Sequence, residues 1–248
     1  MRILMSQAKL PATPIANTLP ILYSLRNCPY AMRARIAIFK AQQQVALREV
    51  VLSNKPEEMI TASAKGTVPI LVLGNEFSPL IVIDESLDVM LWALEQHDPE
   101  DLLNKDDPSA LPNMLTFISK FDDEFKACLN AYKCAKRYRE NNITECRQAC
   151  EVYLQELEKR LVNTRSQHSF IMSDKESLVD IALLPFIRQF AKVERQWYQQ
   201  SPYPKVRQWL NHYLQSPMFT KVMAKHDLWV KKSEPKVTIE KDLRGQVR

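Results

Sequence analysis

Residues 19–31 read Leu-Pro-Ile-Leu-Tyr-Ser-Leu-Arg-Asn-Cys-Pro-Tyr-Ala, and this stretch decides the fold. Its first seven residues are apolar enough for a short strand that tolerates a proline at its beginning. Pro29 then stands where the first turn of a helix needs no N–H donor, so a helix is predicted over about residues 28–41. Cys28 therefore lies at the junction of a strand and a helix.

The segments that follow alternate between strand and helix patterns. Residues 45–52 predict a second strand, and residues 55–66 predict a short helix. Two apolar, β-branched runs, 68–73 and 79–83, are separated by Gly-Asn and predict an antiparallel hairpin. A third helix is expected over 84–96. The order β-α-β-α-β-β-α is that of a thioredoxin-like α/β domain, although other α/β arrangements share it.

The second half of the chain has helical periodicity only. Residues 97–112 are rich in Asp, Pro, Asn and Lys, which is typical of a linker. Helices are expected over 111–140, 143–162, 204–214 and 217–225, so an all-α bundle follows the α/β domain. We divide the chain into a flexible leader (1–18), a thioredoxin-like domain (19–98), a linker (99–107), an all-helical domain (108–230) and a polar tail (231–248).

Ser177 and Asp180 form a capping pair at the start of an apolar helix. The Ser177 side chain covers the Asp180 N–H, and the carboxylate reaches back toward the positive end of the helix. The helix is apolar nearly all round, which places it in the centre of the bundle, and Pro185 is expected to bend it. We assign Ser177 and Asp180 a structural role.

Composition excludes several classes of protein. Only three glycines occur in 248 residues, so no glycine-rich phosphate loop can form. The net charge of +5 is spread along the chain, which argues against nucleic acid as a partner. No apolar run reaches about 18 residues, and the first residues lack a secretory pattern, so a cytoplasmic protein without a membrane partner is expected.

The five cysteines are an odd number in a chain too large to need disulfides, so we interpret them as thiols in a reducing compartment. Four of them lie in helical sequence without the paired C-x-x-C spacing of a metal site: Cys128, Cys134, Cys146 and Cys150. We expect these four to be buried structural residues, and we expect no metal.

Cys28 is the candidate nucleophile. At a helix start its sulfur would lie beside unpaired N–H groups, which favours the reactive thiolate, and Arg33 and Arg35 are expected to add to this effect. The alternative is that Cys28 merely starts the helix, but Ser, Thr, Asp and Asn serve better as caps. Ala31 occupies the position of a resolving cysteine, so an outside thiol must resolve any mixed disulfide.

Four motifs in order resemble one family. They are Cys28-Pro29-Tyr30, Thr67-Val68-Pro69-Ile70-Leu71, Asp84-Glu85-Ser86 and Ser177-Leu178-Val179-Asp180-Ile181-Ala182. Together they resemble the cytosolic glutathione transferases, nearest the cysteine-type branch with the omega-class enzymes and the two-domain glutaredoxins. The resemblance covers about residues 19–225 and implies glutathione as co-substrate, with a homodimer or a monomer as the assembly.

The resemblance also implies a glutathione-binding role for six residues. In the family the proline of the Val68-Pro69 pair is cis, and the Val68 backbone pairs with the cysteinyl part of glutathione. Glu85 and Ser86 match the residues that hold the γ-glutamyl end, and Lys55 is similar to an omega-class lysine that contacts the glycyl carboxylate. Tyr30 either lines the glutathione site or packs against the second domain.

The implied activity is glutathione-dependent thiol transfer, or reductive deglutathionylation of a small electrophilic or disulfide substrate, with Cys28 as nucleophile. The rival hypothesis is a non-catalytic relative that keeps the fold as a protein-binding scaffold. The complete set of matching residues argues against the rival. Four basic residues crowd one helical stretch, Lys133, Lys136, Arg137 and Arg139, which favours a solvated helix face over a site for an acidic substrate.

Overall fold

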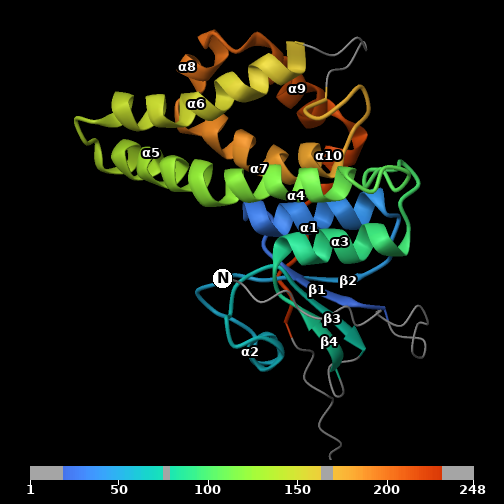
Figure 1. Ribbon diagram of the computed structural model, residues 1–248. Helices are drawn as coiled ribbons and strands as arrows, with labels where there is room; N and C mark the ends of the chain where they lie inside the picture. Colours follow the sequence, from blue (N-terminus) through green and yellow to red (C-terminus); the bar gives the residue numbers. More distant parts are fainter. Residues whose placement is uncertain (1–18, 75–78, 163–169, 231–248) are drawn as a thin grey trace, which may run out of the picture.

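The computed structural model describes residues 19–74, 79–162 and 170–230. The predicted leader (1–18) and polar tail (231–248) lie outside the described residues. Figure 1 shows two parts: a small sheet with its helices, and a larger helical layer stacked on one side of it. The predicted fold class, a thioredoxin-like domain followed by a helical domain, is confirmed.

A mixed sheet of four strands forms the first part. The strands are β1 (Ile21–Ser24), β2 (Ala46–Glu49), β3 (Ile70–Gly74) and β4 (Pro79–Ile83), in the spatial order β2-β1-β3-β4. β1 pairs parallel to β2 and antiparallel to β3, and β4 pairs antiparallel to β3. The predicted hairpin is thus present, although its turn (75–78) lies outside the described residues.

Helices cover both faces of the sheet. α1 (Pro29–Lys40) and α3 (Ser86–Gln96) lie on one face, and α2 (Glu57–Ala62) lies on the other. Alternate side chains of β1 point to opposite faces, so Leu22 joins the core under α1 and α3, whereas Tyr23 joins a smaller core with Met59 of α2. Burial on both faces explains why β1 is apolar throughout rather than alternating.

The helical part runs from residue 110 onward. Its elements are α4 (Ala110–Lys120), a π-helical turn η1 (Phe121–Phe125), α5 (Lys126–Tyr138), α6 (Ile143–Val162), α7 (Leu178–Val193), α8 (Arg195–Gln200), α9 (Pro204–Gln215) and α10 (Pro217–Val222). The predicted bounds of α6 are confirmed. The single helix predicted over 111–140 is wrong in detail, because η1 interrupts it, and the short helix α8 was not predicted.

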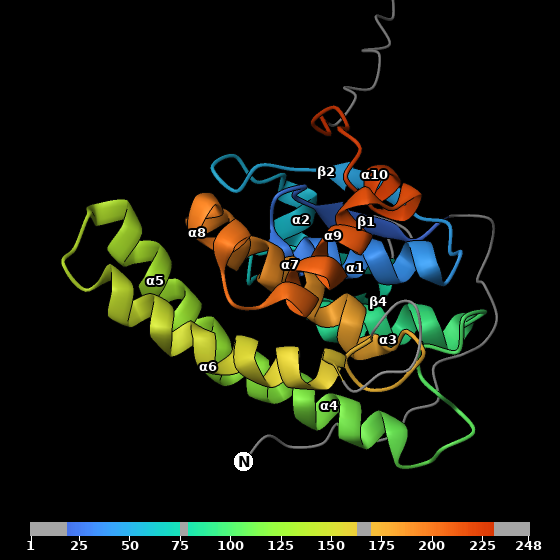
Figure 2. The same cartoon turned by 90° about the horizontal axis from the view of Figure 1, so that it is seen from above.

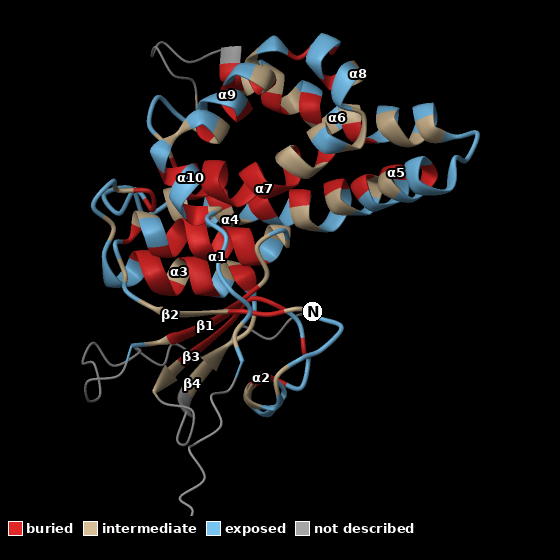
Figure 3. Ribbon diagram, turned by 180° about the vertical axis from the view of Figure 1, so that it is seen from behind, coloured by how far each residue is buried: buried red, intermediate tan, exposed pale blue. Residues whose placement is uncertain are grey.

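α7 is the central helix, and Figure 3 shows it almost entirely buried. The Asp180 carboxylate lies at its start and is fully buried. One oxygen accepts hydrogen bonds from the Ser177 N–H (3.0 Å) and hydroxyl (2.8 Å). The other accepts from the Ile171 N–H (3.0 Å) and the Trp209 indole (3.0 Å). The carboxylate therefore ties three segments of the bundle together.

The two parts are joined through α1 and α7, which lie side by side (Figure 2). Arg33 of α1 donates from Nε to the Ala182 carbonyl of α7 at 2.7 Å. At the far end of the described chain, the Trp229 N–H donates to the Glu49 carbonyl of the edge strand β2 at 2.8 Å. The predicted domain limits, 19–98 and 108–230, remain our proposal for the division of the chain.

Candidate active site

Cys28 is the N-cap residue of α1, with an extended backbone (φ −76°, ψ 124°). The first helical residue, Pro29, has no N–H, and the Cys28 side chain accepts no hydrogen bond from the N–H groups of the helix start. The residue is partly buried, and its Sγ atom lies 3.8 Å from the Val68 carbonyl oxygen. The predicted placement of Cys28 between β1 and α1 leaves the sulfur available for chemistry.

The Val68–Pro69 peptide bond is cis, and it directly precedes β3. A cis X-Pro bond turns the chain sharply, which here brings the Val68 carbonyl next to the cysteine. Gly66 lies two residues earlier at φ +57°. A Cβ atom at Gly66 would lie 3.0 Å from the Lys55 Nζ and 3.0 Å from the Ile60 Cδ1, so the Lys55 ammonium packs against this turn.

The start of α3 is attached to the same turn. Ser63 donates to one oxygen of the Asp84 carboxylate at 2.6 Å, and the Lys65 ammonium donates to the other at 2.8 Å. Although burial opposes it, these two hydrogen bonds hold the pKa of Asp84 below its usual value. Lys65 also pairs with Glu85 at 2.8 Å, and the hydrogen bonds that it donates to Asp84 and Glu85 raise the pKa of Lys65.

Glu85 and Ser86 differ in exposure. Glu85 is the N-cap of α3 and its side chain is 65% exposed, whereas Ser86, the first helical residue, is buried. A helix start with free N–H groups suits a carboxylate, and an exposed glutamate beside it suits an ammonium group. Ser63 and Lys65, which hold Asp84 and Glu85 at the start of α3, were not predicted from the sequence. Their position just before Gly66 could have indicated a role in this turn.

Residues 63–69 therefore form a turn that contacts Cys28, Lys55 and the residues at the start of α3. Ser63 and Lys65 hold the corner at Asp84 and Glu85, Gly66 lies against Lys55, and Val68 lies against Cys28. We call this segment the cis-proline turn. Three residue groups far apart in the sequence, Cys28, Lys55 and the pair Asp84 and Glu85, thus meet around one short segment.

Tyr30 faces the helical domain. Its ring packs edge-on against Phe186 of α7, with centroids 5.2 Å apart, and the Lys126 ammonium lies 5.0 Å from the ring centroid. Tyr30 remains 37% exposed. Of the two interpretations left open by the sequence, these contacts show packing against the second domain, and the exposed part of the ring leaves room for a contact with a ligand.

The prediction that Arg33 and Arg35 favour the thiolate form of Cys28 is wrong. Arg33 is buried and forms a two-pronged ion pair with Asp122, at 2.8 Å and 2.7 Å. Arg35 is buried as well and pairs with Glu49. Both guanidinium groups are neutralised by carboxylates of other elements, so they serve packing and not the cysteine.

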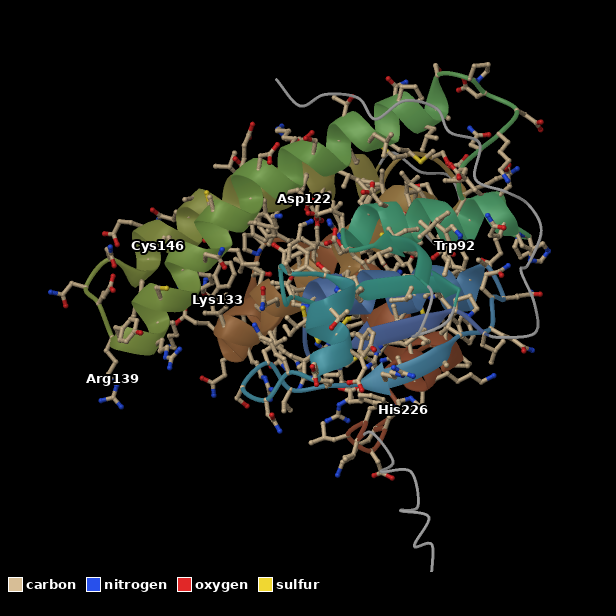
Figure 4. The ribbon with its side chains drawn as sticks, turned by 90° about the horizontal axis from the view of Figure 1, so that it is seen from below. Trp92, Asp122, Lys133, Arg139, Cys146 and His226 are labelled. Atoms are coloured by element: carbon tan, nitrogen blue, oxygen red, sulfur yellow. The ribbon has the colours of Figure 1, made fainter. Side chains whose placement is uncertain are left out.

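The expectation of four buried cysteines holds only for Cys150. Cys128 and Cys146 are partly buried, and Cys134 is exposed on α5. All five cysteines are free thiols. Figure 4 shows Cys146 on the outer helix pair, with Arg139 pointing out from the end of α5. Nearby, Lys136 pairs with Glu194 at 3.1 Å.

Within the described ranges, no group of three or more His, Cys, Asp or Glu side chains is placed to hold a metal ion. No helix in that part of the chain is both long and apolar enough to cross a membrane.

Comparison with known families identifies the class of protein. Residues 22–101 match the N-terminal domain of glutathione S-transferases, and residues 140–212 match the C-terminal domain of the same family. The two matches together cover more than half of the chain and include both structural parts. The chain belongs to the glutathione S-transferase family, a family of transferases.

Individual relatives agree with this assignment. The chain is 24% identical to pyrimidodiazepine synthase of Drosophila melanogaster over 79% of this chain and 77% of the relative. It is also 24% identical to glutathione S-transferase omega-1 of Mus musculus, over 84% and 82% of the two chains. A glutathione transferase family member from Pseudomonas fluorescens, solved with two glutathione molecules bound, has a similar fold: the TM-score is 0.69 at 16% identity, over 83% and 92% of the chains.

Proposed function

We propose that this protein is a glutathione-dependent thioltransferase in which Cys28 is the nucleophile. The observation that carries the proposal is the 3.8 Å approach of the Cys28 sulfur to the Val68 carbonyl beside a cis proline. In this arrangement the Val68 backbone faces the same space as the sulfur. A peptide that pairs with Val68 as an added strand would bring its own sulfur to Cys28.

The proposed pose of glutathione follows the cis-proline turn. Its cysteinyl part pairs with the Val68 backbone at Pro69. Its γ-glutamyl carboxylate binds Ser86 and the N–H groups at the start of α3, and its ammonium group binds Glu85. Its glycyl carboxylate binds Lys55, which supplies a single positive charge. Tyr30 borders the site on the side of the helical domain.

The proposed reaction has two exchange steps. The Cys28 thiolate attacks the glutathione sulfur of a mixed disulfide R–S–S–G, the S–S bond breaks, and R–S⁻ leaves and takes up a proton. Cys28 now carries glutathione as a protein disulfide. A second glutathione thiolate attacks the glutathione sulfur of this disulfide, and oxidised glutathione leaves as Cys28 is regenerated. A glutathionylated carbon follows the same course, with R–H as the product.

Ala31 explains why a second glutathione is needed. It lies three residues after Cys28 on the first turn of α1, where a dithiol enzyme carries its resolving cysteine. The methyl group of Ala31 is buried and cannot attack a disulfide. For the mixed disulfide, the net reaction converts R–S–S–G and one free glutathione into R–SH and oxidised glutathione, so the incoming glutathione is the reductant and the protein supplies no electrons.

The test combines binding and turnover. Retention on glutathione resin and reduction of a glutathione mixed disulfide are measured for wild type, Cys28→Ser and Cys134→Ser. Cys134 is the matched control because it is the exposed thiol of α5. We expect Cys28→Ser to bind glutathione but to lose turnover, and Cys134→Ser to keep both. Equal turnover of Cys28→Ser and wild type contradicts the mechanism, and no retention of any variant favours the scaffold hypothesis.

In the cell we expect the protein to act in the cytoplasm, where reduced glutathione is the abundant thiol and the five cysteines stay reduced. The second substrate is a small molecule that binds beside Tyr30, between the two parts of the chain. A homodimer or a monomer is compatible with this proposal, because every candidate residue comes from one chain.

A further inference from the structure

A cleft of about 760 Å³ opens in the helical domain, apart from the cis-proline turn. The end of α7, the short helix α8 and the face of α9 surround it, and Figure 2 shows these three helices side by side. Its volume is in the range of clefts that bind small molecules, about 300–1,000 Å³. None of the residues proposed to bind glutathione lines this cleft.

The walls of the cleft are basic. Arg188, Lys192 and Arg195 lie on the side of α7 and α8, and Arg207 lies on α9. No Asp or Glu is among the lining residues. Ala191, Leu210 and Leu214 form an apolar part of the lining. The cleft therefore offers four permanent positive charges around an apolar patch.

These four cations lack the carboxylate partners that other cations of the helical domain have. Lys120, Lys136 and Arg147 each pair with Glu at 3.1 Å or less. Within the described residues none of the four cleft cations forms an ion pair. Glu158 lies close to Tyr198 of the cleft, but both of its oxygens accept N–H groups at the start of α9, at 2.9–3.0 Å.

Partial desolvation and nearby like charges disfavour the charged forms of two of these side chains, Arg188 and Lys192. Burial and the charge of Arg26 lower the pKa of Arg188. Burial and the charges of Arg188 and Arg195 lower the pKa of Lys192. In addition, the buried Nε of Arg207 has no hydrogen-bond partner in the described part of the chain. An anion that enters the cleft would supply the opposite charge to these side chains.

We propose that this cleft binds a small molecule that carries two or more phosphate groups. The planar guanidinium group of arginine can donate two parallel hydrogen bonds to two oxygens of one phosphate group. A single carboxylate carries too little negative charge to neutralise four cations. The apolar patch at Ala191, Leu210 and Leu214 accommodates a non-phosphate body such as a nucleoside. The concave shape favours a small molecule over an acidic protein surface, which would need a flat and larger contact area.

The test is isothermal titration of the full chain with pyrophosphate and with a nucleoside diphosphate. The cleft variant is Lys192→Gln/Arg195→Gln, because both residues are exposed and we expect the fold to tolerate their substitution. The control is Arg137→Gln/Lys159→Gln, which removes the same charge from exposed positions outside the cleft. Unfolding temperatures of all variants without ligand show whether the fold is kept.

We expect wild type to bind one ligand molecule saturably. We expect the affinity of the cleft variant to be at least tenfold weaker than that of wild type, which corresponds to about 1.4 kcal/mol. The affinity of the control should stay within about twofold of the wild-type affinity. We also expect the affinity to fall as salt is added, because the contacts are between charges near the surface. Equal weakening in both variants, or no saturable binding of either ligand, overturns the proposal. Tighter binding of polyglutamate than of either phosphate compound also overturns it, in favour of an acidic protein partner.

Discussion

The Arg33 guanidinium and the Asp122 carboxylate form a two-pronged ion pair, with N–O distances of 2.8 Å and 2.7 Å, between α1 and η1. Arg33 is 1% exposed and Asp122 is 21% exposed. Removing one partner of such a buried pair lowers the stability of the fold strongly, because the remaining charge is then buried without an opposite charge. The pair joins the helix that follows Cys28 to the helical domain.

We therefore expect Asp122→Ala to lower the free energy of unfolding by about 3 kcal/mol, since the buried charge of Arg33 then loses its carboxylate and keeps only its bond to the Ala182 carbonyl and its contact with the Phe186 ring. Urea denaturation measures the change. Asp123→Ala is the control, because Asp123 lies on the same π-helical turn but is exposed, and we expect a change of about 0.5 kcal/mol or less. Equal losses in the two variants would contradict the assigned role of the pair.

Asp180 makes stability depend on pH. Burial raises the pKa of its carboxyl to about 6, against the hydrogen bonds from Ile171, Ser177 and Trp209 that favour the charged form. The folded state therefore holds a proton between about pH 4 and pH 6 that the unfolded state has lost. Stability from this group is largest at low pH and decreases as the pH rises toward 6.

Comparison with Asp180→Asn isolates this effect, because asparagine does not titrate. We expect the advantage of wild type over Asp180→Asn to be about 2 kcal/mol larger at pH 4 than at pH 7. Denaturation curves of both proteins at several pH values provide the measurement. An advantage that is constant with pH, or that grows toward pH 7, would show that the carboxylate is ionised throughout this range.

We expect a glycine to be required at position 66, because of the backbone conformation there. Its φ of +57° is costly for a residue with a side chain, and an added Cβ would press on Lys55 and Ile60 at 3.0 Å. Gly66→Ala should lower the free energy of unfolding by about 1–2 kcal/mol. It should also weaken glutathione binding, because the cis-proline turn carries Val68. Unchanged affinity and stability would mean that the turn does not depend on this glycine.

Glu85 offers a test of the proposed glutathione pose. Glu85→Gln should raise the KM for glutathione about tenfold, through loss of a charged contact with the ammonium group. Stability should barely change, because the side chain is 65% exposed and its pair with Lys65 contributes little. Glu95→Gln, at an exposed position near the end of the same helix, is the control. Equal KM values for the two variants would remove Glu85 from the site.

Local patterns predicted much of this fold, and long-range contacts explain the failures. The bounds of α6 and the hairpin of β3 and β4 follow from periodicity and turn residues. The π-helical turn η1 does not follow from such local patterns. It carries Asp122, whose partner Arg33 is 89 residues away in the sequence. The same contact removes Arg33 from the surroundings of Cys28, where the sequence analysis had expected it.

The candidate site shows the same limit. Cys28, Val68 and Ser86 could be proposed from short motifs, because two of those motifs mark helix starts and the family resemblance implied a cis proline at Pro69. The role of the cis-proline turn in connecting these residues could not be predicted, because the hydrogen bonds from Ser63 and Lys65 to the start of α3 depend on tertiary packing. The basic cleft was missed for a similar reason: Arg207 is distant in sequence from Arg188 and comes close only through the packing of α9 on α7.

The most direct test of the central claim is the position of the glutathione adduct. The protein is incubated with oxidised glutathione, its intact mass is measured, and the modified peptide is mapped. We predict one added glutathione, on Cys28, even though Cys134 is the more exposed thiol. Modification of Cys134 in preference to Cys28, or no modification of Cys28 at all, would contradict the account.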